Sequence, residues 1–148
     1  MEGIIFIGLQ ASGKSSFYKE RFFNTHMRIS LDLLNTRNKE RQFLDKCLEL
    51  QQRVVIDNTN PDLKTRQRYI QKFKEYKYEV VGYYFQSQIK DCLARNAERK
   101  GKEKIAEKGI LATFQKLELP IWEEGFDRLF YVKIENNQFI INAWENEI

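Results

Sequence analysis

Histidine, cysteine and proline are scarce in this chain of 148 residues, which has one histidine, two cysteines and two prolines. Cys47 and Cys92 fall on expected helices at core-like positions, which indicates buried free thiols in a reducing compartment rather than a disulfide framework. No apolar stretch approaches the length of a membrane helix, and the amino terminus has neither a basic start nor a small-residue cleavage site. We therefore expect a cytoplasmic protein with no membrane partner.

What the chain does contain is an ordinary globular composition. Hydrophobic residues make up 42% and charged residues 31%, and we find no internal repeat or low-complexity linker. These numbers predict a single domain over residues 1–148 with a core of useful size. The net charge of +4 and the pI of about 9.0 are compatible with a polyanionic partner but do not by themselves indicate one.

The chain is organised around the segment Gly8-Leu9-Gln10-Ala11-Ser12-Gly13-Lys14-Ser15, which follows the apolar run 3–7 and precedes an expected helix. Gly, four residues and Gly-Lys-Ser, between a strand and a helix, is the phosphate-binding P-loop. Its backbone N–H groups and the helix N-terminus attract anions, the lysine reaches the β- and γ-phosphates, and the serine holds Mg²⁺. We therefore predict binding of ATP with Mg²⁺ through Gly8, Ala11, Ser12, Gly13, Lys14, Ser15 and Ser16.

Alternating strand and helix patterns predict the fold. We expect an α/β P-loop kinase fold, a three-layer sandwich with a mostly parallel five-stranded sheet, helices on both faces, and a C-terminal antiparallel strand or hairpin. Asn60 is expected to cap one helix, with Pro61 at its first position, and Ser87 to cap the next. The expected strands are 2–7, 27–30, 53–57, 78–85, 128–135 and 138–144; the expected helices are 14–23, 38–52, 60–76, one from 87, and 107–118.

Two aspartates follow the ends of expected strands, where ligands bind in such sheets. Asp32 has the position of a general base that orients a hydroxyl nucleophile, but on spacing alone it could equally cap a short helix. Asp57 ends an apolar strand and is expected to anchor Mg²⁺ together with Ser15. Asn58 and Thr59, which follow it, are expected to continue into the cleft and could hydrogen-bond a substrate.

A basic segment over about residues 95–108 predicts a lid. Arg95 and Arg99 are four residues apart, so they share one face of a helix, and an arginine supplied to the transferring phosphoryl group stabilises its transition state. The lysines that follow alternate with glutamates, which favours a solvated surface for them. The spacing points to Arg95 and Arg99 as lid residues that contact the nucleotide, whereas the prediction that Lys14, Asp32 and Arg99 are catalytic depends also on a family resemblance of the motifs taken together.

Five segments together resemble the kinase domain of 5′-hydroxyl polynucleotide kinases of the phage and animal end-healing type, over about residues 1–132. They are Gly8 to Ser15, Ile29-Ser30-Leu31-Asp32, Val55 to Pro61, Arg95-Asn96-Ala97-Glu98-Arg99, and Pro120 with Glu124-Gly125-Phe126. The resemblance implies that Asp32 is the general base, that Arg99 contacts the β- and γ-phosphates with Arg95 beside it, and that Asp57 and Thr59 line the acceptor side.

The sequence departs from that family at the acceptor. The family often has one arginine just before the catalytic aspartate and another three residues after it, where Leu31 and Asn35 stand here. Arg37 is the nearest substitute, at a different spacing. The favoured hypothesis is ATP-dependent phosphorylation of a polynucleotide 5′-hydroxyl. A small-molecule or nucleoside kinase and an ATP-binding switch that transfers nothing remain as alternatives, and no obligate protein partner is expected.

Overall fold

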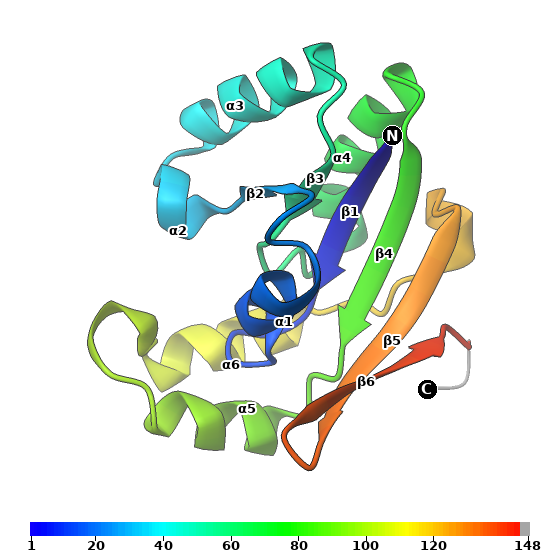
Figure 1. Cartoon of the computed structure of the whole chain (residues 1–148). Helices are drawn as coiled ribbons and strands as arrows, with labels where there is room; N and C mark the ends of the chain where they lie inside the picture. The colour runs from blue at the N-terminus through cyan, green and yellow to red at the C-terminus, as the bar shows by residue number, and fades with distance from the viewer. Residues whose placement is uncertain (146–148) are drawn as a thin grey trace.

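A computed structural model describes residues 1–145 and shows one mixed sheet between helices (Figure 1). The strands are β1 (Glu2–Ile7), β2 (Met27–Ile29), β3 (Val54–Ile56), β4 (Glu79–Phe85), β5 (Arg128–Glu135) and β6 (Gln138–Ala143). The helices are α1 (Lys14–Arg21), α2 (Leu31–Leu34), α3 (Arg37–Glu49), α4 (Leu63–Glu75), α5 (Ile89–Ala97) and α6 (Glu107–Lys116), with short 3-10 turns η1 (Gly101–Glu103) and η2 (Trp122–Glu124).

The sheet order is β2-β3-β1-β4-β5-β6. The first five strands pair in parallel, and β6 pairs antiparallel to β5 through a turn at Asn136 and Asn137, both with positive φ. Two left-handed asparagines are typical of a type I′ hairpin, which matches the twist of its strands. The predicted fold class is confirmed, and the hairpin completes the chain's own sheet.

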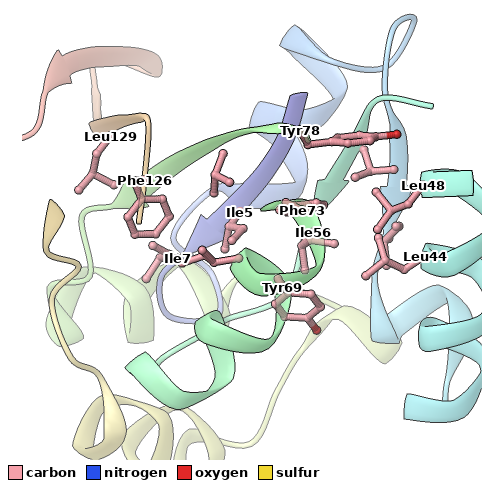
Figure 2. Close-up of a cluster of buried hydrophobic side chains, with 14 of the residues drawn as sticks. Ile5, Ile7, Leu44, Leu48, Ile56, Tyr69, Phe73, Tyr78, Phe126 and Leu129 are labelled. Atoms are coloured by element: carbon pink, nitrogen blue, oxygen red, sulfur yellow. The ribbon is translucent and has the colours of Figure 1, made fainter. Parts of the chain in front are cut away.

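Side chains alternate between the two faces of the sheet because successive strand residues point in opposite directions. Ile5 and Ile7 of β1 pack with α3 and α4, whereas Ile4 and Phe6 pack with α1. Figure 2 shows the first of these layers, a buried cluster to which Ile5, Ile56 and Phe73 belong. Within the described residues every helix is too short or too polar to cross a lipid bilayer.

Two helix caps differ from the prediction. The cap of α4 is Asp62, whose carboxylate accepts from Thr65 N at 2.9 Å. Asn60 instead adopts φ 44° and donates its amide to the carbonyl of Phe6 at 2.7 Å, which ties the end of β1 to the loop after β3. Gln88 precedes α5, while the hydroxyl of Ser87 accepts from Leu9 N at 3.0 Å. Both predictions were wrong because long-range backbone groups compete for the same side chains.

Candidate active site

The P-loop lies between β1 and α1 and is shaped by left-handed residues. Gly13 has φ 102° and Ala11 φ 63°. A side chain at Gly13 would also meet Ile134 and Phe139, because a Cβ built there lies 3.0 Å from Ile134 Cδ1 and 3.1 Å from Phe139 Cε1. Glycine is therefore required at this position both for its backbone conformation and for the approach of the β5–β6 hairpin.

Lys14 is buried, and its ammonium group donates to the carbonyl oxygens of Gly8 at 3.0 Å and Leu9 at 2.6 Å. Burial lowers the pKa of Lys14 to about 8, against the opposing effect of the Asp57 carboxylate.

The two residues predicted to hold Mg²⁺ lie together, because the Ser15 hydroxyl donates to Asp57 Oδ2 at 3.0 Å. An aliphatic hydroxyl and a carboxylate are oxygen ligands of the kind Mg²⁺ prefers, with nucleotide phosphates and water completing its shell. Residues 1–145 contain no group of three or more His, Cys, Asp or Glu that could hold a metal alone. The two side chains are therefore of the kind that could contribute ligands to Mg²⁺.

Arg28 of β2 is the functional candidate that sequence reasoning missed. Its Nε donates to Asp57 Oδ2 at 2.8 Å and its NH2 group to the Ser15 hydroxyl at 3.1 Å. The guanidinium therefore engages both oxygens that a metal would use, and it neutralises a carboxylate whose side chain is only 2% exposed. The one available signal in the sequence was a cation in the middle of a short expected strand; in the sheet this strand, β2, is separated from the P-loop strand β1 by β3.

Asp32 lies in the first turn of α2 with an exposed side chain. The cap of this helix is Ser30, whose hydroxyl accepts from Asp32 N at 3.2 Å, so the capping alternative for Asp32 is wrong. Leu31 N donates to Asn58 Oδ1 at 2.9 Å, which fixes the backbone next to Asp32 against the loop after β3. An exposed carboxylate on a fixed backbone remains available to a substrate.

The lid residues and the acceptor-side residues are held differently. Arg95 donates to Ala11 O of the P-loop at 3.3 Å, and Arg99 donates to Glu103 O at 3.2 Å.

The remaining predicted site residues bond within the protein or lie on its surface. The carbonyl oxygen of Thr59 accepts a hydrogen bond from Gly8 N at 3.0 Å. Arg37 points to its own helix and α4, donating to Glu40 and to the Tyr69 hydroxyl, both at 3.0 Å. Ser12 donates to Leu9 O at 2.7 Å, and Ser16 is exposed on α1.

Residues 32–119 match the family described as AAA domain, a stretch that covers more than half of the chain. The chain belongs to the AAA domain family. This AAA domain protein also resembles curated polynucleotide kinases. A bifunctional polynucleotide phosphatase/kinase from Schizosaccharomyces pombe is 26% identical over 129 residues, which are 84% of this chain and 32% of that protein.

A protein of Acanthamoeba polyphaga mimivirus named "Putative bifunctional polynucleotide phosphatase/kinase" is 38% identical over 81 residues, or 54% of this chain and 19% of that one. The AAA domain protein thus spans about a third or less of these relatives, and the resemblance seen in its motifs is confirmed. A gluconokinase structure from Sinorhizobium meliloti 1021 superposes with a TM-score of 0.61 at 17% identity, covering 89% of this chain and 82% of that one. At that identity the likeness shows the fold alone.

Proposed function

We propose that this AAA domain protein is a kinase that transfers the γ-phosphate of ATP to the 5′-hydroxyl of a polynucleotide. The observation that carries the proposal is that groups from distant parts of the chain meet at the P-loop. Asp57 accepts from the Ser15 hydroxyl at 3.0 Å, and Arg95 donates to Ala11 O at 3.3 Å. The backbone beside Asp32 is bonded to Asn58, the residue after Asp57, at 2.9 Å. A donor cradle, a metal-ligand pair, lid arginines and an exposed carboxylate are the parts that phosphoryl transfer needs. The two curated relatives support the choice of acceptor.

In this proposal the chain is a single P-loop kinase domain, and its last residues, 146–148, lie outside the described structure. The P-loop N–H groups and Lys14 hold the triphosphate, while Ser15 and Asp57 hold Mg²⁺, which would offset phosphate charge. The oxygen of the acceptor hydroxyl bonds to the γ-phosphorus, and ADP leaves. The carboxylate of Asp32 accepts the proton that this hydroxyl loses. Arg95 and Arg99 approach the transferring group when the lid over residues 95–108 closes.

A small-molecule hydroxyl is the second candidate acceptor. Leu31 and Asn35 stand where polynucleotide kinases often have acceptor-binding arginines, and Arg37 is engaged by Glu40 and Tyr69. Transfer from γ-labelled ATP should be compared among 5′-hydroxyl DNA and RNA oligonucleotides, nucleosides and gluconate. Transfer to small alcohols but to no oligonucleotide would overturn the polynucleotide proposal, and transfer to no acceptor would favour a nucleotide switch.

Substituting Asp32→Ala tests the base. We expect the rate of transfer to fall by about 10²- to 10⁴-fold, the usual contribution of a positioned proton acceptor, with ATP affinity nearly unchanged. Arg99→Ala should also abolish transfer, because it removes the transition-state cation. Glu20→Ala, an exposed carboxylate on α1, is the control. Near-normal turnover in Asp32→Ala would show that the base has been assigned wrongly.

A further inference from the structure

A groove of about 340 Å³ lies between α3 and α4, outside the P-loop and its metal-ligand pair. Its floor includes Leu44 and Tyr69, which Figure 2 shows on neighbouring helices. Four cations surround this floor: Arg37, Arg41, Arg68 and Lys72. We call it the α3–α4 groove. An apolar floor within a basic rim is suited to a ligand that combines flat rings with negative charge.

The single carboxylate in this lining does not cancel the charge of the rim. Glu40 is buried, and its oxygens accept from the Tyr69 hydroxyl at 2.8 Å, Arg37 at 3.0 Å and Asn58 at 2.8 Å. Lys72 is paired with Asp45. Arg41 and Arg68 are exposed and form no ion pair within residues 1–145. Two arginines on facing helices are therefore available to an anion.

The groove begins beside the proposed base. Arg37, which lines it, is the first residue of α3 and lies five positions after Asp32. One amide joins the two regions, because Asn58 accepts from Leu31 N at 2.9 Å and donates to Glu40 at 2.8 Å. A strand whose 5′-hydroxyl reached Asp32 would thus find the groove within its next few nucleotides.

We propose that the α3–α4 groove binds the single-stranded segment of the acceptor that follows its 5′ end. Arg41 and Arg68 contact the phosphodiesters, and a base lies in the groove between them, above the buried side chains of Leu44 and Tyr69. This inference rests on the proposed function and deepens it. It also accounts for Leu31 and Asn35, because the cations that hold the strand lie on two helices instead of next to the catalytic aspartate.

The test is the double charge reversal Arg41→Glu with Arg68→Glu, assayed on 5′-hydroxyl oligothymidylates. For a dodecamer we expect an affinity loss of about 10-fold or more, measured by fluorescence anisotropy. The slope of log affinity against log salt should become shallower by about 1.4, since each phosphate contact in a single strand contributes about 0.7. The KM of the dodecamer should rise by more than the KM of a dinucleotide.

The matched control is Lys39→Glu with Lys64→Glu. It changes the net charge by the same amount, at exposed positions of the same two helices that do not line the groove. Equal losses in both double variants, or the same loss for dinucleotide and dodecamer, would overturn the groove assignment. The assignment would also be overturned if polyglutamate displaced the labelled dodecamer as well as unlabelled oligothymidylate does. Salt-sensitive dodecamer binding that depends on Arg41 and Arg68, but without any phosphate transfer, would support the groove and refute the proposed kinase function.

Discussion

The ammonium group of Lys14 lies among the carbonyl oxygens of its own loop, and burial lowers its pKa to about 8 from an ordinary value of 10.5. Because the unfolded chain holds this proton more tightly, Lys14 costs stability at neutral pH. That cost is relieved as pH rises from about 8 to about 10.5. Phosphate binding has the opposite preference, since it requires the charged form.

We therefore predict that ATP affinity is flat below about pH 8 and falls by up to about tenfold per pH unit above it, as the free lysine loses its proton. Isothermal titration calorimetry in buffers of different ionisation enthalpy should show proton uptake on binding at pH 9. Lys19→Met, on an exposed lysine of α1, is expected to keep the same profile. An affinity independent of pH up to about pH 10 would contradict the lowered pKa.

Arg28 bonds to both Ser15 and Asp57, so its substitution tests how the free site is held. Arg28→Met leaves the buried Asp57 without its guanidinium partner, so we expect the metal-free protein to lose about 1–3 kcal/mol of unfolding free energy. Mg²⁺ with ADP should then raise the melting temperature more in the variant than in the parent, because no guanidinium has to leave Ser15 and Asp57. Arg21→Met on α1 is the control, and equal ligand-induced shifts in parent and variant would refute this competition.

At the scale of elements, the C-terminal hairpin supports the P-loop. Phe139 of β6 packs against Phe17 of α1 with ring centroids 5.0 Å apart, and its ring also approaches Gly13. The opposite face of the strand carries Ile140, which is not part of that cluster. The β5–β6 hairpin thus packs against the P-loop and the start of α1.

We predict that Phe139→Ala lowers the unfolding free energy by about 2–3 kcal/mol, less than a fully buried phenylalanine would, because this ring is half-buried. ATP affinity should fall as well, since the loop loses its support. Urea unfolding and calorimetry measure the two effects. Ile140→Ala, a truncation at the next position of the same strand, should change ATP affinity by less than about twofold; an equal loss in both variants would argue against a role of the hairpin in nucleotide binding.

At the scale of the whole molecule, one buried ion pair joins the segments that surround the site. Arg66 of α4 donates to both carboxylate oxygens of Glu124, at 2.7 Å and 3.1 Å, and to Asn60 O at 3.0 Å. Asn60 in turn bonds to Phe6 O at 2.7 Å. The η2 turn, α4 and the ends of β1 and β3 are therefore fixed together, and removal of either charge would leave the other buried and unpaired.

The sequence by itself determined the order of the strands and of the longer helices, together with the P-loop, but it did not predict the four-residue helix α2. The predicted features follow from local patterns: apolar runs and glycines at a fixed spacing. The tertiary structure decided what depends on distant partners. It moved the cap of α4 from Asn60 to Asp62, placed Arg28 against Ser15 and Asp57, and brought Phe139 to Gly13. A side chain with several possible partners bonds to the one that folding brings closest, and no local pattern records that choice.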